Sequence, residues 1–242
     1  NNKAQVTFMI LIAVLIVIIA ALIIYAAGFM NKNAIEPLTF DKPSIENYIN
    51  NCIKRTAENG LKLLGKQGSI APDYYLEAPY YNIQYYFYSN QNKMPTIEKM
   101  QNELELYMNE NLETCLKDFD DFKRQGWNVE KGVIESKAGI NEQDVSFEVN
   151  FPIKVSNKDD ILSLEKFASR LNIRLKYIYN LILAIVEFNA KHQKSIDRIV
   201  LNNYNVNVTV FPYQNSLVYA IDDSESLIMN SPYRFNFALK FE

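Results

Sequence analysis

Residue types on which catalysis commonly relies are scarce in this chain of 242 residues. It has one histidine, His192, together with two cysteines and seven glycines. A zinc site or a histidine-based acid–base pair needs more partners than these. The sequence also lacks a glycine-rich phosphate-binding loop and a nucleophile elbow. Since His192 fits a solvated position near a helix end, we expect no enzymatic activity, no metal ion and no cofactor.

Two carboxylate clusters are the remaining candidates for a cation site. The three aspartates between 118 and 121 fall in an expected helix, which spreads them over different faces, unlike a calcium-binding loop. The acidic residues between 222 and 225 fall in an expected turn. The second cluster is therefore the better candidate.

An excess of positive charge is also absent. The chain has 25 Lys and Arg residues against 28 Asp and Glu residues, which gives a net charge of −3. Because Lys3 is the only charged residue before position 31, removing its +1 leaves residues 31–242 at −4. A nucleic-acid partner is therefore not expected. With 48% hydrophobic and 13% aromatic residues, the chain is far from a disordered composition.

The chain has instead a long stretch without charge, residues 4–30. As a helix it would extend about 40 Å, whereas a bilayer core needs only about 20 apolar residues. It is too long for the apolar region of a cleaved signal peptide, and a buried helix of a soluble protein usually has a polar face. Residues 1–30 therefore predict a hydrophobic helix, a stalk that spans a membrane or forms the core of a filament.

The flanks of the stalk predict where the rest of the chain lies. Lys3 precedes the stalk and Lys32 follows it, which is a weak charge bias, and the N-terminal flank is only a few residues long. We expect the remainder to lie outside the cell, anchored by or exported through the stalk. Residues 31–43 form a neck, in which Pro37 and Pro43 prevent a continuous helix.

The first part of the head, residues 44–126, predicts two helices around a tyrosine-rich segment. Ser44 caps the first helix and Gly68 ends it. The second helix begins after Thr96 and ends at Gly126, because its apolar residues recur every three or four positions between them.

The second part of the head, residues 127–242, predicts a sheet with one long helix. Alternating apolar residues predict strands at about 127–137, 143–155, 203–211, 216–222 and 232–241. The first two pair around a turn near 139–141, and Pro152 indicates an edge or a bulge. Apolar spacings of three and four predict a helix from about 160 to 195. We therefore expect an α+β head with a mostly antiparallel sheet and long amphipathic helices.

The only two cysteines, Cys52 and Cys115, each lie on the apolar stripe of an expected helix. An extracellular compartment permits a disulfide, and closing a loop of about 60 residues adds about 4 kcal/mol in the chain-entropy treatment. Two buried thiols acting as small apolar side chains are the alternative. We favour a disulfide that joins the first two helices of the head.

Seven of the 16 tyrosines fall between residues 74 and 88, and three interpretations of them stay open. Both faces of the expected strand around Tyr85, Tyr86 and Tyr88 are aromatic. Tyrosine favours places that are dry at one end and wet at the other, so an inter-subunit surface fits. A core within the head fits equally well, and a sugar-binding surface is the third alternative.

The chain contains an N-glycosylation sequon, Asn207-Val208-Thr209. The sequon lies in an expected strand. An extracellular head makes Asn207 a candidate glycosylation site.

The N-terminal segment resembles a known class of proteins. Lys3, Ala4 and Gln5, followed by the apolar helix, are similar to the N-terminal segments of archaeal surface proteins of the type IV pilin class. The resemblance implies export and assembly into a filament through the helix. Met9, the fifth residue counted from Gln5, stands where many pilins have Glu. The remainder of the chain resembles single-anchor surface proteins of small-genome archaea. The resemblance lies in the order of three segments, which are YINNCIKRTAENGLKLLGKQG, then ELYMNENLETCLKDF, then a closing aromatic strand.

The sequence thus predicts a structural subunit of an extracellular filament, pilus or tube, with stalks packed inside and heads outside. Small residues favour close packing of such helices. The candidate assembly positions are Ile10, Val14, Val17, Ala20, Ala21, Ile24 and Gly28. The main partner is then further copies of the chain in a helical polymer, with the membrane before or instead of assembly. The alternative is a membrane-anchored extracellular domain that binds a partner or an envelope component without polymerising.

Overall fold

The computed structural model describes residues 18–19, 42–158, 160–192 and 203–241. The chain divides into two compact units, residues 1–39 and Phe40–Glu242, and the second unit is the head. Within the described residues, no helix is long and apolar enough to cross a membrane. Outside them lie all the predicted assembly positions: Ile10, Val14, Val17, Ala20, Ala21, Ile24 and Gly28.

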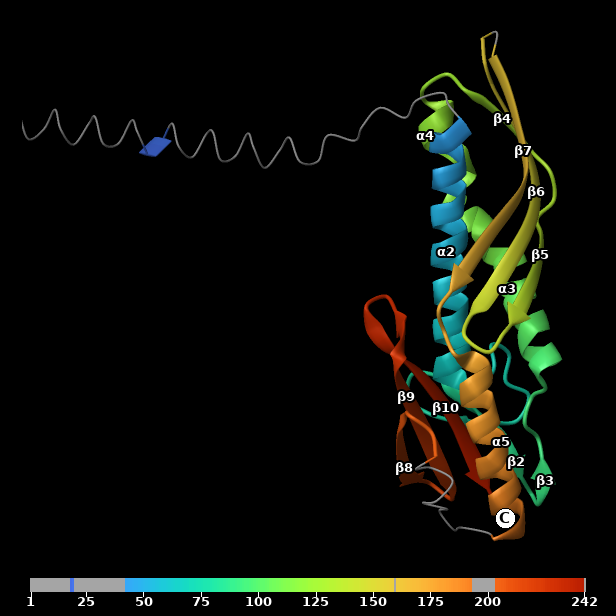
Figure 1. Cartoon of the computed structure of the whole chain (residues 1–242), viewed down its shortest axis with the longest axis vertical. Coiled ribbons are helices and arrows are strands. Elements are labelled where there is room, and N and C mark those ends of the chain that lie inside the picture. The colour runs from blue at the N-terminus through green and yellow to red at the C-terminus, as the bar shows by residue number, and fades with distance from the viewer. Residues whose placement is uncertain (1–17, 20–41, 159, 193–202, 242) are drawn as a thin grey trace, which may run out of the picture. The chain divides into compact units, whose positions relative to one another are not determined.

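The head begins with α2 (Lys42–Gln67), which runs from beside α4 (Asp120–Lys123) to the six-stranded sheet (Figure 1). A helix of 26 residues extends about 39 Å. Gly68 follows the helix with a φ of 75°, and its amide donates a hydrogen bond to the Leu64 carbonyl at 2.7 Å. Because a left-handed C-cap favours glycine, this residue ends the helix as predicted.

The second helix, α3 (Ile97–Leu116), packs beside α2. As predicted, Thr96 caps it, and the Thr96 side chain accepts a hydrogen bond from the Lys99 amide at 3.2 Å. The expected continuation to Gly126 is wrong, since residues 117–119 have φ values of 46°, 52° and 58°. The chain turns there through η1 (Lys117–Phe119) into the short α4 (Asp120–Lys123).

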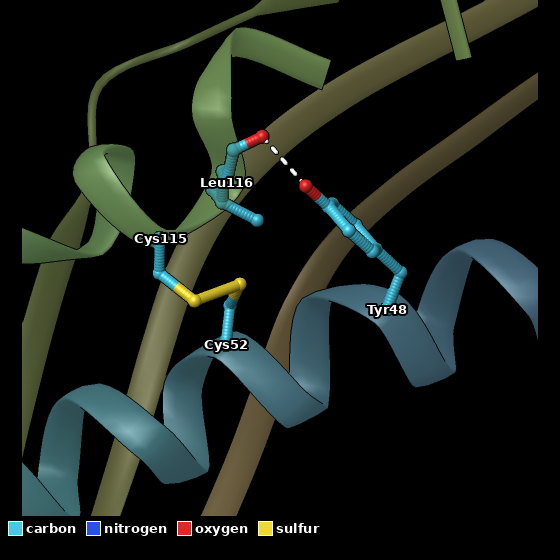
Figure 2. The surroundings of a disulfide bond; sticks show 4 residues. All are labelled: Tyr48, Cys52, Cys115 and Leu116. Carbon is cyan, nitrogen blue, oxygen red and sulfur yellow. Dashed lines mark hydrogen bonds between the residues drawn. A yellow bond between two sulfur atoms is a disulfide. The ribbon is translucent and has the colours of Figure 1, made fainter. Parts of the chain in front are cut away.

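A disulfide joins α2 to α3, and Figure 2 shows its surroundings. Cys52 and Cys115 are bonded, with Cα atoms 5.5 Å apart and a sequence separation of 63. Tyr48, one turn before Cys52, donates its hydroxyl proton to the Leu116 carbonyl at 2.7 Å. The predicted disulfide is therefore confirmed, and it fixes the end of α3 beside the N-terminal half of α2.

A four-stranded sheet packs against α2 and α3. Its strands are β4 (Asn128–Lys131), β5 (Glu135–Ile140), β6 (Val145–Asn157) and β7 (Asp160–Leu171). All pair antiparallel with β6. As predicted, every second residue of β6 from Val145 to Val155 is buried, and Pro152 lies within a bulge.

The predicted helix from about 160 to 195 is wrong in its first part. Residues 160–171 form β7, and up to His192, where the described segment ends, the helical part is α5 (Leu175–Lys191). The ladder between β6 and β7 shifts register after Asn150, so that Leu164 and Phe167 are both buried although they are three residues apart. A bulge therefore reproduces helical spacing in a strand.

The six-stranded sheet packs against the C-terminal part of α2. Its strands are β1 (Tyr75–Glu77), β2 (Asn82–Tyr88), β3 (Gln91–Asn92), β8 (Asn207–Tyr213), β9 (Ser216–Ile228) and β10 (Ser231–Lys240). Their order is β1-β2-β10-β9-β8, with β3 beside β2. Strands β2 and β10 run parallel, and the other pairs are antiparallel. The fold is α+β with mostly antiparallel sheets, as predicted.

The two predicted parts of the head share this sheet. Strand β2 belongs to residues 44–126 and β10 to residues 127–242, and the two strands are hydrogen-bonded neighbours. The ring of Phe237 stacks between Tyr86 and Tyr219, with centroids 5.1 and 4.9 Å away. The boundary at residue 126 therefore does not separate two cores.

Candidate functional site

The tyrosine run divides between the interior and the surface of the head. Tyr86 is 0% exposed, and its hydroxyl donates a hydrogen bond to the Gly68 carbonyl at 2.7 Å. Tyr85 is also buried, with its hydroxyl 3.0 Å from Ser216 Oγ, while Tyr88 is half-buried. Of the open interpretations, the core one therefore holds for Tyr85 and Tyr86. Tyr86 packs against Phe237 and the end of α2, and Tyr85 packs in a cluster with Leu76 and Val218.

The remaining tyrosines form an aromatic and basic surface around β1 and β2. Tyr74, Tyr75 and Tyr80 are 47%, 42% and 89% exposed. Lys93 Nζ lies 4.7 Å from the centroid of the Tyr74 ring, which is 6.0 Å from the Tyr88 ring. A lysine over an exposed aromatic ring contributes about 0.5–1 kcal/mol. The run therefore leaves several phenol rings accessible from solvent.

A pocket of about 350 Å³ adjoins this surface, between α2 and the hairpin of β9 and β10. It is lined by three cationic side chains, Lys62, Lys66 and Arg234, and by Tyr81 and Pro232. Lys66 Nζ lies 4.3 Å from the centroid of the Tyr81 ring. We call these five residues the basic pocket.

The charges of the basic pocket are unevenly paired. Arg234 Nε and Nη2 donate hydrogen bonds to the two carboxylate oxygens of Asp222 at 2.7 and 2.9 Å. These bonds raise the pKa of the Arg234 guanidinium. Neither Lys62 nor Lys66 forms an ion pair within the described part of the head. Three cations against one carboxylate leave two surplus positive charges here, although residues 31–242 carry −4.

A larger cavity of about 530 Å³ lies along β5, β6 and β7. Its charged lining consists of Glu135, Lys137, Glu148 and Lys166. Two carboxylates and two ammonium groups cancel in formal charge. This cavity therefore favours neither an anionic nor a cationic ligand.

The acidic residues between 222 and 225 pair with arginines instead of forming a cation site. Asp223 is 0% exposed and accepts hydrogen bonds from Arg174 Nη2 and Nε at 2.6 and 3.1 Å. Arg174 Nη1 lies 2.6 Å from Glu225, and Ser226 donates a hydrogen bond to Asp223 at 2.5 Å. Burial alone raises the pKa of the Asp223 carboxyl, but the bonds from Arg174 and Ser226 outweigh it and hold the pKa below its usual value.

The other cation candidates also have protein partners. Asp118 accepts hydrogen bonds from Lys123 and Lys131, which hold its pKa at about 2. His192 follows the end of α5, where its ring stacks on Phe188 with centroids 4.7 Å apart. Across residues 42–158, 160–192 and 203–241, no group of three or more His, Cys, Asp or Glu residues is placed to hold a metal ion.

Asn207 begins β8, which stands at the end of the strand order. Asn207 and Thr209 are both exposed, and residues two apart on a strand point to the same side. The sequon is therefore accessible from one side of the sheet.

Comparison of the chain with models of protein families, with curated proteins and with solved structures gives no significant match. The candidate site consequently rests on geometry. The sequence analysis did not predict the basic pocket. The one local indication of it is that Lys62 and Lys66 lie four residues apart in an expected helix, which places two positive charges on one face. Arg234 joins them only because the β9–β10 hairpin folds back onto the end of α2.

Proposed function

We propose that the chain is a structural subunit of an extracellular filament, with residues 5–30 as the packed core and the head on the outside. The observation that carries the proposal is the disulfide between Cys52 and Cys115. Disulfides persist in oxidising compartments outside the cytoplasm. A disulfide-bonded head that follows an uncharged stretch of this length fits a protein exported by, or anchored through, its N-terminal segment.

The arrangement of the head supports the same proposal. The described part of the head begins at the N-terminal end of α2, and the six-stranded sheet packs against the opposite end of this helix (Figure 1). A helix of 26 residues puts about 39 Å between these ends. The aromatic surface and the basic pocket would then be presented away from the point where the stalk joins the head.

A second candidate is a membrane-anchored head that binds a partner without polymerising. The burial of Tyr85 and Tyr86 favours it, because two of the three expected contacts between neighbouring heads are used inside the head. The stalk would then remain in lipid, and the pocket would bind a soluble or envelope component.

The test compares wild-type chain with Val17→Asp and Val17→Leu variants in a host that exports the protein. We expect wild-type and Val17→Leu protein to appear as filaments in sheared cell-surface material by negative-stain electron microscopy. An unpaired charge in an apolar core is costly, so Val17→Asp should give no filaments. Normal filaments from Val17→Asp would refute assembly through this segment. Wild-type protein found only in detergent-extractable membranes would favour the anchored candidate.

A further inference from the structure

We propose that the basic pocket binds a negatively charged saccharide. The pocket combines a local surplus of positive charge with an aromatic ring and a proline, and each feature matches one part of an acidic sugar. The inference does not depend on polymerisation and is tested on the unassembled chain.

The positive charge is concentrated on one turn of α2 and on β10. Lys62 and Lys66 lie four residues apart, so their side chains lie on the same face of the helix. Lys62 is exposed and Lys66 is half-buried against the Tyr81 ring. Arg234 pairs with Asp222 and lines the same pocket as the two lysines. A carboxylate or sulfate on the ligand would compensate the two unpaired ammonium groups.

The remaining lining suits a sugar ring better than a bare anion. Pro232, Met229 and the part of Tyr81 that Lys66 leaves uncovered present apolar surface beside the cations. The C–H face of a pyranose packs on such surface while its hydroxyls face polar groups. The phenol of Tyr81 combines an apolar body with a polar end. Inorganic phosphate would use the lysines but would leave this apolar side uncovered.

The size and surroundings of the pocket disfavour a long polyanion. A volume of about 350 Å³ is near the lower end of the usual range for small-molecule sites. Nucleic-acid-binding proteins present a continuous basic stripe along the backbone of their ligand. Here the surplus of two positive charges is local, on a chain whose residues 31–242 total −4. The occupant that fits is therefore one or a few residues of an acidic glycan.

The experiment measures binding to the full chain in detergent by isothermal titration calorimetry. The probes are trigalacturonic acid, the neutral trisaccharide maltotriose, inorganic phosphate and a short single-stranded oligonucleotide. We expect trigalacturonic acid to bind most tightly and to weaken as salt is raised, because exposed charges are screened.

Two variants and one matched control identify the site. Lys62→Gln/Lys66→Gln should weaken trigalacturonate binding about tenfold and remove most of its salt dependence. Tyr81→Ala should weaken it about fivefold and leave the salt dependence unchanged. The control, Lys137→Gln/Lys166→Gln, removes the same charge from the other cavity and should bind like wild type.

Several results would overturn the proposal. One is that trigalacturonate does not bind, or that phosphate, the oligonucleotide or maltotriose binds as tightly as trigalacturonate. Another is that Tyr81→Ala leaves the affinity for trigalacturonate unchanged. A third is that the control pair weakens binding as much as Lys62→Gln/Lys66→Gln. Circular dichroism and the intact disulfide check that every variant is folded. Size-exclusion chromatography in detergent selects unassembled chain for the titration. The binding test therefore does not depend on filament formation, and the filament test does not depend on the binding of trigalacturonate.

Discussion

The Tyr233 hydroxyl donates a hydrogen bond to the Leu61 carbonyl at 3.0 Å and so joins the last strand of the head to its first helix across 172 positions of sequence. Tyr233 is 1% exposed, and burial raises the pKa of its phenol far above the usual range. At this contact Gly65 lets the helix approach the strand backbone. A Cβ atom on Gly65 would meet the Arg234 carbonyl oxygen at 2.3 Å and the Tyr233 ring at 3.0 Å.

The close approach predicts the effect of Gly65→Ala on stability. In a free helix this change gains about 1 kcal/mol, but here the new methyl group collides with backbone that cannot rotate away. We expect a loss of roughly 3 kcal/mol in the free energy of unfolding, measured by urea denaturation. Gly60→Ala is the matched control, because its Cβ would meet the movable side chain of Tyr107 at 2.9 Å. Equal effects of both changes would contradict this account of the helix–strand contact.

The disulfide predicts a large loss of stability when it is removed. Replacing Cys52 and Cys115 together by alanine should lower the free energy of unfolding by about 4 kcal/mol, because the unfolded chain regains the freedom of a long closed loop. Urea denaturation of the variant and the wild type measures the difference. Mass spectrometry of non-reduced peptides from wild-type protein should show one linked pair. Finding two alkylatable thiols after denaturation without reductant would mean that the bond does not form.

The burial of Tyr86 predicts that it contributes much more to the stability of the head than the exposed Tyr80 does. Tyr86→Ser removes a fully buried ring and the hydrogen bond to Gly68, so we expect a loss of roughly 3–5 kcal/mol. Tyr80→Ser removes the same atoms from a side chain that is 89% exposed and should change stability by less than about 0.5 kcal/mol. Thermal unfolding of the full chain in detergent, followed by near-ultraviolet circular dichroism, compares the two. A stable Tyr86→Ser protein would place this ring outside the core.

The pair of Arg174 and Asp223 predicts a pH-dependent contribution to stability. The pKa of the Asp223 carboxyl is lower in the folded than in the unfolded chain, where it is about 3.9. Its stabilising effect is therefore fully present above about pH 4 and is lost as the pH falls through the lower folded value. Asp223→Asn should cost roughly 3 kcal/mol at pH 7 and progressively less below pH ~4.

Urea denaturation of Asp223→Asn and wild-type protein between pH 3 and pH 7 measures this dependence. Asp73→Asn is the control, because Asp73 pairs with Lys99 on the surface with a side chain that is 59% exposed. An exposed pair of this kind contributes at most about 1 kcal/mol. A constant difference between Asp223→Asn and wild type over the whole pH range would exclude the carboxylate as its source.

Local patterns predicted several elements of the head well. The second helix begins after Thr96 because its cap is encoded within a few residues, and β6 follows from strict alternation. The predicted cap at Ser44 is wrong, since α2 already includes Lys42 and Pro43, and proline is tolerated in the first turn of a helix. The same reasoning assigned residues 160–171 to a helix, because a bulge in the ladder with β6 changes which side chains of β7 are buried. Register between strands is a property of two segments, so one segment's spacing does not reveal it.

The candidate site shows the same division between local and distant information. The positions of Lys62 and Lys66 on one face of α2 follow from helical periodicity alone. Their meeting with Arg234 depends on a chain reversal between β9 and β10 and on the packing of that hairpin against α2. The exposure of Tyr80 and the burial of Tyr86 likewise depend on which strands flank β2.

The sequence by itself determined the uncharged N-terminal stretch, the α+β class, the caps at Thr96 and Gly68 and the pairing of Cys52 with Cys115. Each follows from composition, from local capping signals and periodicity, or from the presence of only two thiols. The tertiary structure alone decided that β2 lies parallel to β10, that residues 160–171 pair with β6, and that the basic pocket exists. These features arise from contacts between segments far apart in the chain, and their free energy comes from packing and backbone pairing that no single segment encodes.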